Sequence, residues 1–324
     1  MKLKDIKSFI INIFCGMAWI LPVYFFARDF FNIEDLKNIS NKHLIEVLSF
    51  SIKQGVYSTI FSFFISLIPA YYVAYNKNIL TKLINGLIFI PFFFPVISVV
   101  TVFSIVFNLG IFKNFNILYS LKAIIIANIF YNSPIFIKYI SDGLQRIPKE
   151  LNEAMKVDGA SDIIIFIKGQ LPLILPQVFR GFILVFTYCF LGFGIVLSLG
   201  GIKFSTLEVE IATTLMIGSD FSKAMFLGAI QIIILLMFNI LGIAVKEYEL
   251  IGNSEQRKTP GCFMLYSTIY MLLEYSVIIF AFVYSFFNIF TGKFAFIAYK
   301  NLFSEKFGED YAVLESLFNS LKLS

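Results

Sequence analysis

Few side chains in this 324-residue sequence are of the types that perform chemistry in proteins. His43 is the only histidine, which argues against a histidine-based zinc site or proton relay, and we interpret it as a solvated loop residue. The three cysteines, Cys15, Cys189 and Cys262, show no paired spacing and are predicted to be small buried side chains. We therefore expect no bound metal and no cofactor.

Motifs of nucleotide-binding and hydrolytic enzymes are also missing from the sequence. No G-x-x-x-x-G-K-[ST] loop occurs, and the T-G-K-F at 291–294 lacks both the upstream glycine and the hydroxyl residue that bind phosphate. The patterns G-x-S-x-G and H-E-x-x-H do not occur either. The sequence predicts a protein that is not an enzyme, so any ATP hydrolysis would come from a partner.

Long apolar segments make up most of the chain. The sequence is 58% hydrophobic and 15% charged, whereas a soluble domain has about 45–50% and 25%. Runs near 20 residues predict transmembrane helices, and hence an all-α integral membrane protein, a polytopic helical bundle. The net charge of +5 suits basic cytoplasmic loops and gives no reason to expect nucleic acid. The predicted spans are 9–26, 56–75, 84–107, 123–140, 178–199, 225–245 and 262–287.

Glu274 is the one ionisable residue that we place well inside a predicted span. We interpret it as a carboxyl group that faces the bundle, either paired or protonated, because charge in the bilayer is costly. The alternative is an ion-coupled secondary transporter or a channel that uses Glu274. Pro69, Pro91, Pro95 and Pro134 are expected to break the backbones of their spans.

The most informative segment is a polar stretch, residues 146–176, between two predicted spans. Pro148 suits the first position of a helix, and Glu150 and Glu153 follow in the first turns, where negative charge favours the helix dipole. Gly159 is predicted to end this helix, because glycine readily adopts positive φ.

A second short helix is predicted over 163–168, with an N-cap from Ser161-Asp162 and an end at Pro172 and Pro176. In the first helix, a small and mostly apolar face is formed by Leu151, Ala154, Met155 and Asp158. Two short helices at an angle indicate a docking surface for another protein. The alternative is an amphipathic hairpin that lies on lipid headgroups.

This segment resembles the EAA loop of ABC importer permeases, whose pattern is E-A-A, three residues, G, nine residues, then I-x-L-P. Residues 153–155 read E-A-M, and Gly159 and then Leu171-Pro172 follow at the family spacing. Met155 stands where the family has a second alanine, and Gly169 where it has isoleucine. The larger Met155 is expected on the docking face.

The resemblance implies a bundle of the type I ABC importer permease kind, with about six spans plus a seventh. It also implies that the first helix of the loop couples to a cytoplasmic ATPase, with Glu153 as polar anchor, Ala154 and Gly159 allowing close approach and Asp158 bracing the turn. The loop and the N-terminus would then be cytoplasmic. The residues assigned to coupling are Glu150, Glu153, Ala154, Met155, Asp158, Gly159, Leu171 and Pro172.

A second stretch, residues 199–211, is similar to the external loop of ferric-iron and thiamine permeases. Its two glycines would let the chain reverse at the membrane surface. The resemblance places this loop near the translocation path, and the alternative is a simple surface turn. The residues concerned are Gly200, Gly201, Thr206, Glu208 and Glu210.

The chain is predicted to hold a first permease half (1–245), a cytoplasmic linker (246–261) and the start of a second half (262–324). Residues 313–322 echo 44–53 with four identities, and iron and thiamine permeases are commonly fused duplicates. We interpret the chain as the N-terminal part of such a fusion, truncated in its second half. The alternative is a six-span subunit with a seventh anchoring helix.

Taken together, these observations favour a permease subunit of a binding-protein-dependent ABC importer in the cell (inner) membrane. The resemblance implies four partners: a cytoplasmic ABC ATPase dimer, an extracytoplasmic substrate-binding protein, a second permease half and membrane lipid. Ferric iron or thiamine as the substrate follows from the resemblance alone.

Overall fold

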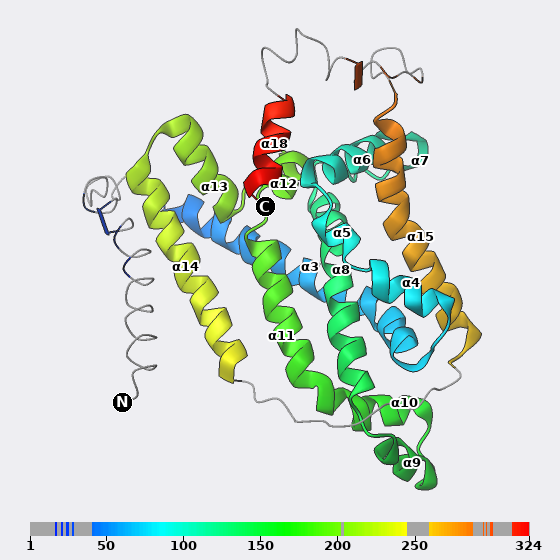
Figure 1. Cartoon of the computed structure of the whole chain (residues 1–324). Helices are drawn as coiled ribbons and strands as arrows, with labels where there is room; N and C mark the ends of the chain where they lie inside the picture. Colours follow the sequence, from blue (N-terminus) through cyan, green and yellow to red (C-terminus); the bar gives the residue numbers. More distant parts are fainter. Residues whose placement is uncertain are drawn as a thin grey trace.

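The computed structural model describes residues 41–201, 204–244, 259–287 and 313–323, with isolated positions 17, 21, 24, 25, 28, 294, 296, 299 and 300. These residues are almost entirely helical, which confirms the predicted all-α bundle (Figure 1). The predicted span 9–26 lies almost wholly outside them. Within the described part, five helices could cross a membrane: Lys42–Tyr75, Leu121–Gln145, Asp162–Phe190, Phe221–Gly242 and Gly261–Tyr284.

The bundle is built on two long helices, α3 (Asn41–Tyr75) and α8 (Leu121–Gln145), which pack along each other. The contact face of α3 carries small polar side chains, among them Ser58, Ser62 and Ser66, all fully buried. Small residues let membrane helices approach closely and hydrogen-bond across the contact. Ser66 Oγ accordingly donates to the carbonyl of Ser133 on α8 at 2.9 Å.

The predicted span 84–107 does not form one straight helix, and the break that we expected at Pro95 is confirmed. The chain forms α4 (Ile79–Leu87), α5 (Ile90–Phe93) and α6 (Val96–Asn108), and the path bends by 93° before α6. Phe94 is extended at φ −70° and ψ 139° because it precedes Pro95, whose ring disfavours a helical neighbour. This bent pair is either a sixth crossing or a re-entrant loop.

Pro69 and Pro134, which we expected to break their spans, lie inside the continuous helices α3 and α8. A proline in a helix frees the carbonyl four residues before it, and a neighbouring helix can satisfy that carbonyl. At Pro69 this carbonyl belongs to Ile65, and the hydroxyl of Tyr266 on α15 (Gly261–Tyr284) donates to it at 3.3 Å. At Pro69 the helix therefore does not break, because a neighbouring helix satisfies the freed carbonyl.

The predicted span 178–199 is also wrong in its bounds. Its helix, α11 (Leu171–Phe190), ends near Gly192, and α12 (Gly194–Gly200) is a separate short helix. The crossing instead starts earlier, at Asp162, inside the stretch that we expected to be polar loop. The next crossing, α14 (Phe221–Ala244), closely matches its predicted span 225–245.

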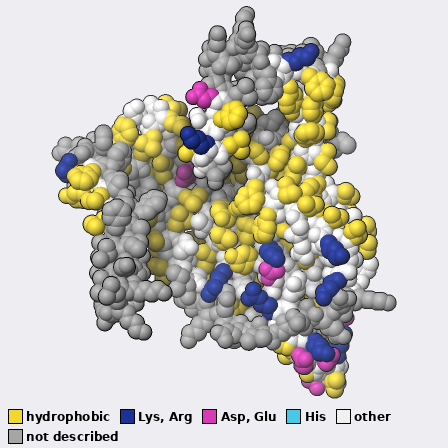
Figure 2. Space-filling view, in the orientation of Figure 1, with side chains coloured by type: hydrophobic (Ala, Val, Ile, Leu, Met, Phe, Trp, Pro, Cys, Tyr) yellow, Lys and Arg dark blue, Asp and Glu magenta, His cyan; other side chains and the backbone are white. Residues whose placement is uncertain are grey.

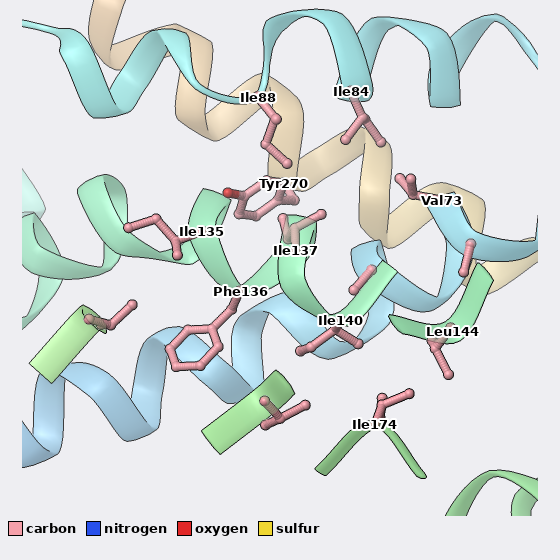
Figure 3. Packing of buried hydrophobic residues seen from close by; sticks show 14 of the residues in the cluster. Val73, Ile84, Ile88, Ile135, Phe136, Ile137, Ile140, Leu144, Ile174 and Tyr270 are labelled. Carbon is pink, nitrogen blue, oxygen red and sulfur yellow. The ribbon is translucent and has the colours of Figure 1, made fainter. Parts of the chain in front are cut away.

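An apolar core joins these helices near the end of α8 (Figure 3). Ile137, Ile140 and Leu144 of α8 lie among side chains of α3, α4, α11 and α15. Gly143 allows α11 to pack tightly here, since a Cβ at this position would lie 2.5 Å from Oε1 of Gln177. This core holds the start of α11 against the end of α8, and so fixes both ends of the polar segment between them.

Two of the three cysteines can be placed. Cys189 is fully buried on α11, as predicted, whereas Cys262 is exposed at the start of α15, so the prediction of burial was wrong there. Cys262 lies in the first turn of α15, before the helix reaches the apolar core. Cys15 lies outside the described residues.

Candidate functional site: residues 146–176 and 199–211

The polar segment forms a helical turn below the ends of α8 and α11, whose first helix is α9 (Lys149–Val157). Pro148 caps this helix, one residue before the position that we predicted. The helix ends as predicted, because Gly159 adopts φ +81°, which glycine tolerates best. The N–H of Ala160 then donates to the carbonyl of Met155 at 3.0 Å and closes the turn.

The second helix of the turn differs from the prediction. Ser161 Oγ accepts the N–H of Ile164 at 3.4 Å, so the predicted N-cap of α10 (Asp162–Ile164) is confirmed. Pro172 and Pro176 do not end the helix, which continues through a π-helical segment, η1 (Ile165–Gln170), into α11. Pro172 is tolerated because it falls in the first turn of α11, directly after the wider π turns.

The inner side of α9 is fastened to η1 by a buried polar pair. Gln170 Nε2 donates to Asn152 Oδ1 at 2.7 Å, and both side chains are fully buried. Leu151 is half-buried beside them and packs against the apolar core. These contacts make the turn continuous with α11, so a displacement of α9 would be carried into a membrane-crossing helix.

The two residues that depart from the EAA pattern touch each other. A Cβ on Gly169 would lie 2.5 Å from Sδ of Met155. Met155 is half-buried and points inward, so our expectation that it enlarges the docking face was wrong. Met155, which stands where the family has alanine, thus fills the space left by Gly169, which stands where the family has isoleucine.

The outer side of the turn is exposed, and Figure 2 shows charged and apolar side chains mixed at this lower tip. Four predicted coupling residues lie there: Glu150, Glu153, Ala154 and Asp158. Val157 and Ile163 are 87% and 71% exposed on the same turn, and we did not predict either. Their position beside the Gly159 turn was the signal that could have identified them. Of the remaining two, Pro172 is exposed and Leu171 is half-buried.

The second stretch, residues 199–211, is organised differently, around α13 (Leu207–Thr213). Thr206 Oγ1 accepts the N–H of Val209 at 3.5 Å and caps this helix, while the N–H of Leu207 donates to Ser51 Oγ on α3 at 2.9 Å. Gly201 turns the chain at φ +64°, and a Cβ there would lie 3.0 Å from the ring of Tyr119. Gly200 is buried against Ile124.

Both acidic side chains of α13 hold it to neighbouring helices. Glu208 Oε2 accepts from Gln231 Nε2 of α14 at 2.6 Å. Glu210 Oε1 lies 3.0 Å from Nζ of Lys223 and 3.2 Å from Nε2 of His43. Partial burial raises the pKa of the Glu210 carboxyl, but the hydrogen bonds from Lys223 and His43 outweigh it and hold the pKa below its ordinary value. His43 is half exposed, as expected of a solvated residue, but it lies on α3 and not in a loop, and it is a partner of Glu210.

Two ionisable residues lie near the middle of membrane-crossing helices. Glu274 faces the bundle as predicted, is 6% exposed and accepts from Ser133 Oγ at 3.0 Å. Arg180 was missed as the second, because the true start of its crossing at Asp162 puts it near the centre of that helix. It is exposed in a pocket of ≈ 420 Å³ lined also by Thr187 of α11 and Asn239 of α14.

The fold is that of a polytopic membrane protein. Two of its crossing helices, α8 and α11, are joined by a helical turn that is hydrogen-bonded to the bundle. The family model for the binding-protein-dependent transport system inner membrane component matches residues 62–248, more than half of the chain. The chain belongs to this family of inner-membrane transport permeases. The family bears out the interpretation of the chain as a transport component.

Several curated proteins resemble the chain at low identity. It is 27% identical over 222 residues to the thiamine transport system permease protein ThiP of Haemophilus influenzae, and covers 40% of that protein's length. It is 26% identical over 212 residues to the probable sulfate transport system permease protein cysT of Helicosporidium sp., and covers 77% of it. Each alignment involves 62% of this chain.

One solved structure supports the fold. A chain of the MetNI methionine ABC transporter in an inward-facing conformation aligns with a TM-score of 0.50 and 17% identity, over 63% of this chain and 96% of the other. This likeness confirms the importer-permease type of bundle.

Proposed function

We propose that this chain is a permease subunit of an ABC importer and that the α9 turn is the place where a separate cytoplasmic ATPase binds. The proposal rests chiefly on one observation: exposed Val157 and Ile163 lie on a turn whose inner side is fastened to α11 by Asn152 and Gln170. Exposed apolar side chains that protrude into water beside charges are typical of a protein interface.

The remaining parts of the transporter follow from this role. The α9 turn and the N-terminus would be cytoplasmic, and the α13 segment would face an extracytoplasmic substrate-binding protein. Arg180 at the centre of its crossing must face protein or water rather than lipid. We therefore infer that the α11 and α14 face around Arg180 lines the translocation path or contacts a second permease half.

Residues 262–324 are proposed to begin that second half. In support, α15 lies beyond the family-matched residues 62–248 yet packs on α3, α5 and α6 as an additional crossing helix. The helix α18 (Val313–Leu323) falls on the segment that echoes 44–53. Thiamine is the proposed substrate, because proteins named as thiamine permeases recur among the relatives, but relatives named for sulfate also match.

Photocrosslinking in native membranes tests the proposal. Val157 is replaced by p-benzoylphenylalanine, and Phe115, which is 61% exposed near α7 (Gly110–Lys113) at the other end of the bundle, serves as the matched control. We expect Val157 to capture a soluble protein that carries a phosphate-binding loop, and Phe115 not to capture it. Capture of lipid alone from Val157 would contradict the proposal.

A further inference from the structure

A cavity of ≈ 400 Å³ lies between α6, α8 and α15 and has no part in the proposed coupling. Its walls are almost entirely apolar and include the aromatic rings of Phe103, Phe130 and Phe280. Leu273 borders it and is 65% exposed, so the cavity opens on the apolar outer surface of the bundle. Its volume falls within the range of about 300–1,000 Å³ that small-molecule sites occupy.

The one carboxyl group in this wall is that of Glu274. Its Oε1 accepts from Ser133 Oγ at 3.0 Å, and Ser133 Oγ also lies 2.9 Å from the hydroxyl of Tyr270. Its Oε2 is buried and has no hydrogen-bond partner among the residues that the structure describes. No ion pair to Glu274 is formed within the same residues. One buried acceptor on a residue that lines the apolar cavity therefore has no partner among the described residues.

The chemistry of this wall selects for a particular kind of ligand. A buried carboxyl oxygen without a partner is unfavourable, and a donor that enters the cavity removes that cost. An ammonium group would donate to the carboxyl group of Glu274 and also balance the charge of a carboxylate. The three phenylalanine rings would favour a cation near their faces, while the apolar walls would accept a hydrocarbon body.

We propose that this cavity binds an organic amine with an apolar body, which enters from the lipid and donates an ammonium N–H to the carboxyl group of Glu274. A neutral analogue of such a molecule lacks the positive charge that this wall favours. An anionic analogue lacks the hydrogen-bond donor as well. The inference concerns α15 and its contacts, and it holds whether or not the α9 turn binds an ATPase.

The test uses the full chain in phosphatidylcholine nanodiscs with tritiated 4-phenylbutylamine as the probe. We expect the amine to be retained, and 4-phenylbutan-1-ol to compete at least about tenfold more weakly than unlabelled amine. Glu274→Gln is expected to abolish that preference. The control Glu46→Gln removes an exposed carboxyl on α3 and should leave the preference intact.

Equal competition by the amine and the alcohol in the wild-type chain would overturn the proposal, as would an unchanged preference in Glu274→Gln. A second variant covers the case in which Glu274→Gln does not fold. Val106→Trp fills the cavity from α6 and leaves Glu274 in place. It is expected to abolish retention of the amine, and undiminished retention would likewise overturn the proposal.

Discussion

The α9 turn and the α13 segment are both short helical connections between crossings, yet they use their charged residues in opposite ways. In the α9 turn, Glu150, Glu153 and Asp158 are exposed, and no hydrogen bond within the described chain holds Glu150 or Glu153. In the α13 segment, Glu208 and Glu210 are both engaged by α14. The first region leaves its polar groups available on its surface, whereas the second uses them to hold its own helix.

The regions also differ in what fastens them. The α9 turn is held from inside, by the Asn152 and Gln170 pair and by Met155 over Gly169. The α13 helix is held by its partly buried carboxylates, Glu208 and Glu210, and by the hydrogen bond from the N–H of Leu207 to Ser51 Oγ. Perturbing the inner contacts should therefore affect the α9 turn most, whereas perturbing a charged side chain should matter most in the α13 segment.

The largest effect is expected from Gly169→Ile. The new side chain would overlap Met155, and overpacking of this kind costs about 1–3 kcal/mol. Hydrogen exchange over 149–157 should accelerate. Adding Met155→Ala makes room and should recover most of the loss, so a double-mutant cycle should give a coupling energy of about 1–3 kcal/mol. Additive effects of the two changes would show that the two side chains do not share this space.

A smaller loss is expected from Gly159→Val. A Cβ at Gly159 meets no atom within 4 Å, so the cost comes from the backbone at φ +81° alone, about 1–2 kcal/mol. Gly86, on α4, has equally open surroundings but no positive φ, and Gly86→Val should change the free energy of unfolding by less than about 0.5 kcal/mol. Similar losses at both sites would contradict the role given to Gly159.

In the α13 segment, Glu210→Gln should weaken the contacts that hold α13 by about 1 kcal/mol, measured as lower hydrogen-exchange protection factors over 205–214. Because the folded state lowers the pKa of Glu210, its contribution is present above the ordinary value of 4.5 and is lost as the pH falls through the lowered folded value. Acid should lower these protection factors in the wild type more than in Glu210→Gln. An equal response of both chains would exclude Glu210 as the cause.

The smallest effect is expected from Lys156→Ala in the α9 turn. Lys156 Nζ lies 3.7 Å from Oδ1 of Asp162, but both side chains are more than half exposed. Exposed pairs of this kind contribute about 0–1 kcal/mol, so exchange over 149–164 should hardly change. A marked acceleration would mean that surface charge, and not the inner contacts, holds the turn.

The sequence was most informative where local chemistry decides the structure. Apolar runs predicted the crossing helices, and glycine at 159 predicted the end of α9 because few other residues adopt its φ. The EAA spacing identified the turn itself. These features depend on neighbours in the chain, which a single sequence displays.

Features that depend on distant residues were predicted poorly. At Pro69 the helix stays continuous because the hydroxyl of Tyr266, about two hundred residues away, donates to the carbonyl that the proline frees. The inward direction of Met155 required knowing that Gly169 faces it. The position of Arg180 near the centre of its helix depended on where that helix begins. The π-helical segment η1 had no recognisable signal in the sequence.

The central claim is that the exposed side of the α9 turn binds an ATPase subunit, and one measurement tests it most directly. The chain is purified in mild detergent from its native membranes as wild type, as Val157→Asp and as the control Phe115→Asp, and co-purifying ATP hydrolysis is measured. We predict that Val157→Asp loses at least about 90% of that activity, corresponding to about 1.4 kcal/mol of binding, while Phe115→Asp retains it. Full co-purifying activity with a correctly folded Val157→Asp chain would contradict the account.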